Sequence, residues 1–218
     1  MKLLNEEVRT QLHQVFENMK TDVTIALFTK EGECETCKET DSFLNELVET
    51  SEKLHLVRYD LDQHQEVAEK YQVKIVPAIV LLDHQKEYQR IKFNGIPAGH
   101  EINSFVKGIL EVSGAGIPLP EAMAERLAAV KEPVNIKVFV TLGCPHCPGA
   151  VEKAHKLALM NPYVEAEMIE AQTFYDLSEK FNVSSVPKVV INDEYEFVGN
   201  QSLEVFMEEI EKTQVTAH

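Results

Sequence analysis

The chain has 218 residues, 44% of them hydrophobic and none of them tryptophan, and carries a net charge of −15 at pH 7. This length accommodates two domains of about 100 residues, and the negative charge disfavours nucleic acids and anionic membrane surfaces as partners. No apolar run approaches the roughly 20 residues that a membrane span needs. The acidic start also lacks the long apolar stretch of a secretory signal, so we expect a cytoplasmic protein.

The hydrophobic pattern alternates between helical and strand periods twice along the chain. In the first half it predicts helices at 4–19, 34–48, 64–72 and 100–111, and strands at 23–28, 54–60, 78–82 and 88–94. In the second half it predicts helices at 121–130, 144–160, 173–181 and 202–213, and strands at 135–140, 164–170, 188–191 and 194–198. Each half is therefore expected to be an α/β domain in which helices cover a central sheet.

A boundary between the two domains is expected at 113–120, where glycine and proline are frequent and no periodic pattern continues. We place the N-terminal domain at residues 1–116 and the C-terminal domain at 117–218. Because the boundary segment is short, the domains are expected to touch rather than to be widely separated.

The two halves are copies of one another. Each contains a CxxC pair, and these pairs begin 110 residues apart, at positions 34 and 144. In both halves the proline of a Val-Pro dipeptide follows the second cysteine by 40 residues, giving Val76-Pro77 and Val186-Pro187. A period of this length indicates a duplicated domain, not an array of short repeats.

All four cysteines lie in the CxxC pairs: Cys34 with Cys37, and Cys144 with Cys147. The first cysteine of each pair is predicted at the start of a helix, where unpaired N–H groups and the helix dipole favour a thiolate. The second lies one turn deeper and can attack a mixed disulfide on the first. We therefore predict that Cys34 and Cys144 are the attacking thiols, and that Cys37 and Cys147 resolve the mixed disulfide.

The dipeptides between the cysteines differ. His146, in Pro145-His146, can stabilise the thiolate of the second site, which makes that site the stronger oxidant; His146 could also be only a solvated loop residue. Glu35, in the first site, opposes a thiolate. Pro145 suits a first helical turn, whereas Pro148 is expected to bend the helix.

Other interpretations of these residues stay open. Structural zinc is one, since zinc sites also use CxxC, but zinc ribbons separate their pairs by about 15–20 residues and the spacing here is far larger. Asp60 and Asp62 follow a strand and could titrate near the first site, although helix capping is the favoured role for one of them. A lone Val-Pro bond is usually trans.

In its two CxxC pairs, two Val-Pro dipeptides and equal spacing, the chain resembles the two-domain protein disulfide oxidoreductases, or glutaredoxin-like proteins, of archaea and some bacteria. The resemblance implies two tandem thioredoxin-like folds, each a central mixed sheet flanked by helices. It implies that Pro77 and Pro187 are cis, and that the backbone beside them, with Val76 and Val186, binds an extended substrate peptide. It also implies protein substrates with disulfides or thiols, capabilities as oxidase, reductase and isomerase, and no bound cofactor. From the cysteine spacing and the scattered histidines, we predict no metal site.

Two redox functions compete. The leading hypothesis is a broad protein disulfide oxidoreductase that receives electrons from a thioredoxin-reductase-type donor. The alternative is a relay between a flavoprotein disulfide reductase and a peroxidase, similar to the tandem N-terminal region of the alkyl hydroperoxide reductase flavoprotein. That region has a single working CxxC pair, whereas this chain has two CxxC pairs. The direction of net electron flow stays open.

Overall fold

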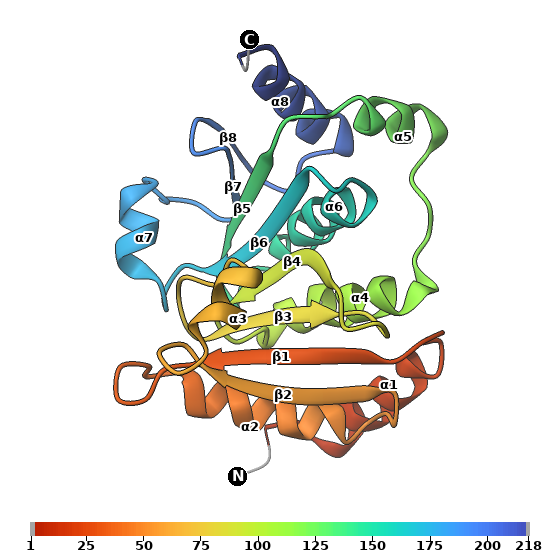
Figure 1. Cartoon of the computed structure of the whole chain (residues 1–218), viewed down its shortest axis with the longest axis vertical. Coiled ribbons are helices and arrows are strands. Elements are labelled where there is room, and N and C mark those ends of the chain that lie inside the picture. The colour runs from red at the N-terminus through yellow and green to blue at the C-terminus, as the bar shows by residue number, and fades with distance from the viewer. Residues whose placement is uncertain (1–2, 217–218) are drawn as a thin grey trace. The chain divides into compact units, whose positions relative to one another are not determined.

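In the computed structural model, which describes residues 3–216, helices and strands alternate along the first half of the chain (Figure 1). In order these elements are α1 (Glu6–Phe16), β1 (Val23–Thr29), α2 (Cys37–Val48), β2 (Leu54–Asp60), α3 (Gln65–Lys70), β3 (Ala78–Leu82) and β4 (Tyr88–Asn94). A 3-10 turn, η1 (Gly99–Glu101), then leads into α4 (Ile102–Leu110), which a π-helical turn, η2 (Glu111–Ala115), extends.

The second half repeats this order. Its elements are α5 (Glu121–Ala128), β5 (Val134–Val140), α6 (Cys147–Met160), β6 (Val164–Glu170), α7 (Tyr175–Lys180), β7 (Lys188–Ile191), β8 (Tyr195–Val198) and α8 (Leu203–Thr216). Each helix and strand predicted from the sequence is present, and most ends shift by only a few residues.

The strands of both halves pair in the same mixed pattern. In the first half the order is β2-β1-β3-β4, with β1 parallel to β2 and β3 antiparallel to both of its neighbours. In the second half the order is β6-β5-β7-β8, with the same directions. The predicted fold, two α/β domains with mixed sheets, is confirmed.

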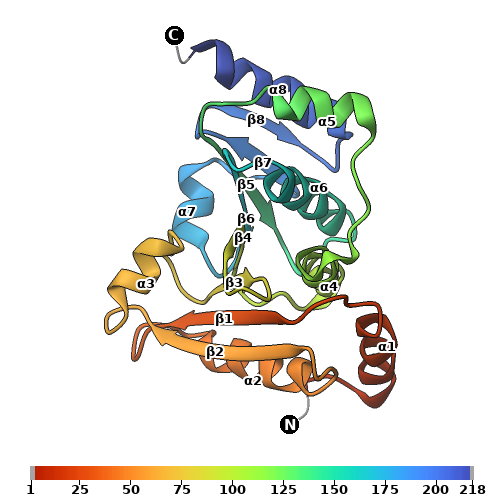
Figure 2. The ribbon, with the colours of Figure 1, turned by 45° about the vertical axis from the view of Figure 1, so that its right-hand side comes forward.

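The strand β1, central in the first half, is buried on both faces, which explains its nearly continuous apolar sequence. In the first part of β5, the half-buried residues Asn135 and Lys137 alternate with buried apolar residues. In β1, Ala26 and Phe28 pack on the α3 side in a cluster with Tyr71, and Ile25 and Leu27 alternate with them and are also buried. Within each half a long helix accompanies the parallel strands, α2 beside β2 and α6 beside β5 and β6 (Figure 2). Each of these helices begins at the second cysteine of a CxxC pair.

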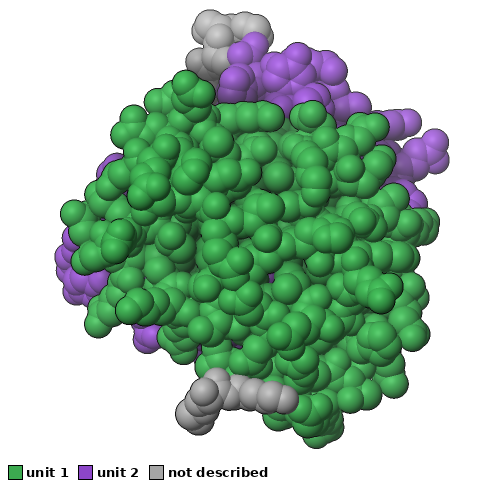
Figure 3. Space-filling model, turned by 60° about the horizontal axis from the view of Figure 1, so that its bottom comes forward, with its two compact units in different colours: residues 1–96, 108–116 green, residues 97–107, 117–218 purple. Residues whose placement is uncertain are grey.

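The chain divides into two compact units, coloured separately in Figure 3. One contains the residues up to Ile96 together with 108–116, and the other contains 97–107 together with the residues from Ile117 on. The division at 116/117 remains our proposal for the repeat boundary. The compact units differ from this division in one segment, residues 97–107, which belongs to the second unit.

Several local expectations were wrong. The helices begin at Cys37 and Cys147, three residues later than predicted. Pro148 therefore lies in the first turn of α6, where an N–H has no partner within the helix, and the expected disruption does not occur. Asp60 does not cap a helix; its carboxylate accepts from the N–H groups of the next residues and closes a turn.

Among residues 3–216, no helix is long and apolar enough to cross a lipid bilayer.

Candidate redox sites

Each CxxC pair forms a disulfide within its own unit. The Cα atoms of Cys34 and Cys37 are 5.4 Å apart, and those of Cys144 and Cys147 are 5.5 Å apart. The first cysteine of each pair is half-buried, whereas the second is buried, 7% exposed at Cys37 and 0% at Cys147. The outer sulfur is thus the one that an incoming disulfide can reach.

Both pairs lie at the edge where parallel strands end. Thr29 at the end of β1 pairs with Asp60 at the end of β2, and Val140 pairs with Glu170 in the same way. The cysteine loops follow β1 and β5 directly, and the helices begin at the second cysteine. Thr36 and His146 are the N-cap residues, and neither makes a side-chain capping bond. The N–H groups of the first turn, with the helix dipole, can therefore stabilise a thiolate on the first cysteine.

The peptide bonds Val76–Pro77 and Val186–Pro187 are both cis, as the family resemblance implies. The residues after these prolines open β3 and β7, and they pair with the last part of the strands that lead to the cysteines: Ala78 with Phe28, and Lys188 with Phe139. Each cis bond therefore lies at the same sheet edge as its CxxC loop. Pro77 and Pro187 are buried, and Val76 and Val186 are half-buried.

The loop before each cis bond starts from the same helix end. Gln72 and Asn182 adopt positive φ angles of 55° and 51° just after α3 and α7. Val73 N–H donates to Ala68 O at 2.8 Å, and Val183 N–H donates to the equivalent Ser178 O at 2.9 Å. A second hydrogen bond accompanies it in each unit, from Gln72 N–H to Glu69 O and from Asn182 N–H to Glu179 O. The two bonds together form a Schellman motif, which ends a helix and directs the chain away from it. The sequence similarity around residues 70–80 and 180–190 thus corresponds to one local structure.

The edge of the first site is densely charged. Lys30, which follows β1, lies 2.8 Å from Glu33 and 3.6 Å from Asp62. The hydrogen bond to Glu33, and then the charge of Asp62, raise the pKa of Lys30. Glu33 and Glu35 flank Cys34 directly. In the second unit the segment 141–143 has no charged residue, and Gln172 stands at the position of Asp62.

A buried carboxyl group that sequence reasoning missed lies in the second unit. Glu101, in η1, is 0% exposed, and its Oε1 atom has no hydrogen-bond partner. Ser104 donates to its other oxygen. Burial is the main cause that raises the pKa of Glu101 to about 7, and the charge of Glu152 on α6 adds to it. No local pattern distinguishes this glutamate, because its burial depends on η1 packing against α6.

The η1 segment also makes a hydrogen bond to the loop that precedes Cys144. The N–H of His100 donates to the carbonyl of Leu142, 2.9 Å away and two residues before Cys144. Gly99 has a φ of +57°, and a Cβ atom there would lie 2.5 Å from the same carbonyl oxygen. Only glycine permits this approach without a shift of the backbone.

His146 lies at the surface of the second site, at the N-cap position of α6. Its influence on the Cys144 thiolate remains a prediction. Across residues 3–216, no three or more histidine, cysteine or acidic side chains are grouped so that they could hold a metal ion.

Comparisons with known proteins agree with this geometry. Residues 6–108 match the Thioredoxin family and residues 134–212 match a second thioredoxin-domain family. A structure of the alkylhydroperoxide reductase AhpF from Enterococcus faecalis is 32% identical, with a TM-score of 0.89 over 95% of this chain and 99% of that one. This chain is a two-domain oxidoreductase of the thioredoxin superfamily. Both halves of the sequence are covered, so the duplication inferred from the spacing is a duplication of the thioredoxin domain.

Further relatives come from both bacteria and archaea. A protein disulfide oxidoreductase from Aeropyrum pernix is 30% identical, with a TM-score of 0.88 over 96% of this chain and 93% of that one. The corresponding alkyl hydroperoxide reductase of Staphylococcus epidermidis is 28% identical over 212 residues. That match covers 97% of this chain but 38% of the relative, so the chain spans about two fifths of the length of such proteins.

Proposed function

We propose that the chain exchanges electrons with disulfides and thiols of other proteins through two CxxC sites. The observation that carries the proposal is the paired arrangement of a half-buried outer cysteine, a buried inner cysteine at a helix start, and a cis Val-Pro bond at the same sheet edge. This arrangement occurs once in each unit.

The chemistry follows from the positions of the sulfurs. In the reducing direction, the thiolate of Cys34 or Cys144 attacks one sulfur of a client disulfide, and the other client sulfur leaves as a thiolate. The inner cysteine, Cys37 or Cys147, loses its proton and attacks the outer sulfur. The second client thiolate leaves, the CxxC disulfide closes, and two electrons have passed to the client. Oxidation of a client dithiol runs the same steps backwards.

The client polypeptide is proposed to lie along the backbone of Val76-Pro77 or Val186-Pro187. An extended segment there makes main-chain hydrogen bonds that do not depend on its sequence, which suits a protein with many clients. Val76 and Val186 lie at the same sheet edge as the CxxC loops, which supports this role.

The two sites are proposed to have different redox potentials. The acidic flank of Cys34 opposes its thiolate, whereas the second site has His146 and no charged residue in 141–143. A more stable thiolate makes the disulfide the stronger oxidant.

A second candidate function is a dedicated relay from a flavoprotein disulfide reductase to a peroxidase. The similarity to an alkyl hydroperoxide reductase over 97% of this chain favours it. In both functions the redox partners are other proteins. We propose a thioredoxin-reductase-type electron donor, a cytoplasmic location, and no nucleic-acid or membrane partner, given the net charge of −15.

The test compares three full-length variants with the wild type: Cys34→Ser/Cys37→Ser, Cys144→Ser/Cys147→Ser, and all four serines. Reduction of insulin disulfides is followed with dithiothreitol, and separately with NADPH and thioredoxin reductase. Each two-serine variant should retain part of the rate, and the four-serine variant should match the uncatalysed rate. A four-serine variant as active as the wild type would overturn the proposal. A strong preference for a peroxidase disulfide over insulin would favour the relay.

A further inference from the structure

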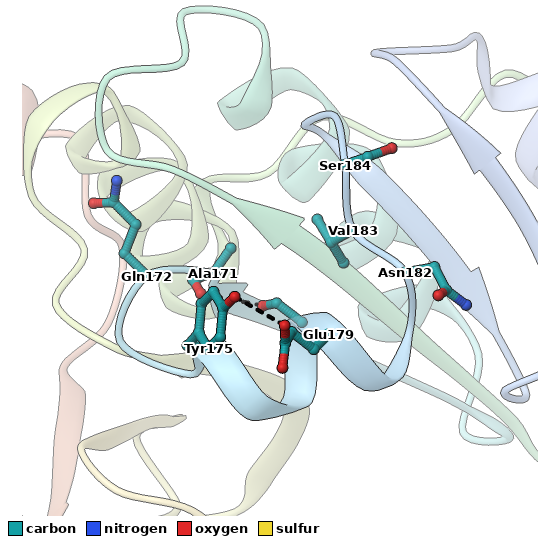
Figure 4. Close-up of a pocket in the computed structure, with 8 residues that line it drawn as sticks. Ala171, Gln172, Tyr175, Glu179, Asn182, Val183 and Ser184 are labelled. Atoms are coloured by element: carbon teal, nitrogen blue, oxygen red, sulfur yellow. Dashed lines mark hydrogen bonds between the residues drawn. The ribbon is translucent and has the colours of Figure 1, made fainter.

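An open pocket of about 510 Å³ lies in the second unit beside α7 (Figure 4). Its lining comes from the turn after β6, from α7, and from the segment that leads towards the cis bond. The eight lining residues are Ala171, Gln172, Tyr175, Ser178, Glu179, Asn182, Val183 and Ser184. Neither the CxxC chemistry nor the cis proline uses this pocket.

The pocket belongs to the same sheet edge as the second redox site. Ala171 directly follows the end of β6, and its N–H donates to Val140 O, 2.8 Å away at the end of β5. The loop to Cys144 starts from that same residue. At the other end of the pocket, Ser184 is three residues from Pro187, so the two are at most about 10 Å apart. An extended client segment bound beside Pro187 rises about 3.3 Å per residue, so a side chain a few positions from its cysteine can reach the pocket.

The chemistry of the lining is acidic and hydrogen-bonding. The hydroxyl of Tyr175 donates to a carboxylate oxygen of Glu179, 2.8 Å away, as the dashed line in Figure 4 marks. This hydrogen bond is the main cause that raises the pKa of Tyr175, so the tyrosine stays neutral. None of the eight lining residues is basic.

Apolar surface lies beside this charge. The Tyr175 side chain is 61% exposed, and Val183 is half-buried across the pocket. The hydroxyl of Ser178 is occupied, because it donates to the carbonyls of Phe174 and Ala171 at 3.0 and 3.2 Å. The nearby lysine of the helix, Lys180, lies with its ammonium 5.3 Å from the centre of the Phe181 ring. The pocket therefore offers a carboxylate, an aromatic face and a short apolar wall.

We propose that this pocket binds a lysine or arginine side chain of the client polypeptide, a few residues from the client cysteine that reacts with Cys144. The carboxylate of Glu179 attracts the cation, and the ring of Tyr175 offers it a π face. The methylene stem of such a side chain can lie against Tyr175 and Val183 while its charged end stays hydrated. This assignment rests on the proposed function and names the substrate class of its second site.

The first unit does not reproduce the pocket chemistry. At the equivalent positions, 110 residues earlier, Gln65 replaces Tyr175 and Lys74 replaces Ser184. Asp62, in place of Gln172, is 3.6 Å from the ammonium of Lys30. Glu69 occupies the position of Glu179 and is likewise exposed. A preference for basic clients should therefore belong to the second site, and Glu69→Gln is a matched control that removes the same charge elsewhere.

The experiment uses the full chain with Cys34→Ser/Cys37→Ser, so that only the second site reacts. The probes are ten-residue peptides with one cysteine joined to thionitrobenzoate by a disulfide. Lysine, glutamine or glutamate is placed in turn at each of three positions on either side of the cysteine. The reduced protein attacks the peptide sulfur and releases thionitrobenzoate; closure of the Cys144–Cys147 disulfide then releases the peptide thiol. Single-turnover rates are measured in 0.15 M salt, where long-range attraction is screened.

At one or two positions the lysine peptide should react about three-fold faster than the glutamine peptide, the size expected of an exposed ion pair. Glu179→Gln should abolish this ratio and Glu69→Gln should preserve it. A ratio that is absent at every position, or equal in both variants because it reflects the overall negative charge, overturns the proposal. Reduction of neutral hydroxyethyl disulfide separates the two hypotheses: if that reaction fails as well, the proposed function itself is wrong.

Discussion

Lys188 directly follows the cis proline of the second site, and its ammonium donates a hydrogen bond to the carbonyl of Phe181, 2.7 Å away at the end of α7. The same ammonium lies 3.4 Å from Asn182 O and 3.0 Å from a carboxylate oxygen of Glu196. Lys188 is only 5% exposed. It therefore links the two ends of the loop that leads from α7 to Pro187.

The first unit has the same link, built from a different strand. There the ammonium of Lys92, in β4, donates to Gln72 O at 2.7 Å. Lys92 pairs with Val80 in β3, whereas Lys188 is the first residue of β7. Both lysines reach carbonyls at the C-terminal end of a short helix, where the helix dipole favours a positive charge. In both units a buried lysine thus holds the loop before the cis proline, from β4 in the first unit and from β7 in the second.

Replacing Lys188 with methionine should lower the free energy of unfolding by about 1–3 kcal/mol, because the carbonyl of Phe181 loses its charged donor inside the protein. Urea denaturation followed by circular dichroism measures this change. Lys180→Met, which removes an exposed lysine of the neighbouring helix, should change stability by less than about 0.5 kcal/mol. Equal changes in the free energy of unfolding for the two substitutions would show that the hydrogen bond from Lys188 to Phe181 does not contribute to stability.

The second CxxC site should be more oxidising than the first. Each site is titrated alone in glutathione buffers, in the full chain with the other pair replaced by serine. The second site is expected towards about −180 mV, the range of the isomerases, and the first nearer about −270 mV, the value of thioredoxin. Two sites that both lie at or below about −270 mV would indicate a reductant or relay, and would refute the argument from the dipeptides.

His146→Gln should make the second site more reducing, because the histidine no longer stabilises the Cys144 thiolate. A three- to ten-fold change in the equilibrium with glutathione corresponds to about 15–30 mV. His84→Gln, a change at an exposed histidine of the first unit, is the control. A potential that does not change in His146→Gln would assign His146 no role in stabilising the thiolate.

Glu101 should make the stability of the protein depend on pH. Its carboxyl binds a proton more tightly in the folded state, where its pKa is about 7, than in the unfolded chain, where it is near 4.5. Stability from this group is therefore fully present below about pH 4.5 and is lost as the pH rises to 7. The loss is on the order of 3 kcal/mol, at 1.36 kcal/mol per pKa unit.

Glu101→Gln removes this titration while it keeps the shape and the contact with Ser104. Relative to the wild type, the variant should therefore gain stability between pH 5 and pH 8, measured as urea midpoints at the two values. All other residues are the same in both proteins, so their contributions cancel in the difference. Glu152→Gln, at the residue whose charge adds to the shift, should reproduce only a minor part of the effect. A stability difference that is the same at both pH values would contradict the burial argument.

Local patterns in the sequence were sufficient to predict the architecture. The 40-residue spacing from Cys37 to Pro77 recurs from Cys147 to Pro187 because each half has the same two helices and one strand between these positions. The apolar run in β1 indicates burial on both faces of a central strand, which residue type and period alone reveal. The helix starts were three residues off, since cap geometry depends on how the loop after the strand closes.

What the sequence could not reveal depends on segments that meet only in the folded chain. Glu101 is buried because η1 packs against α6, and Lys188 and Lys92 are held inside by carbonyls from preceding helices. The pocket at Tyr175 and Glu179 likewise exists only because the segment that precedes Pro187 lies beside α7. By itself, then, the sequence determined the duplicated domain and its four redox cysteines, through spacing and period. The tertiary structure decided which charged groups are buried, because burial, which sets the cost of a charge, is a property of contacts between distant segments.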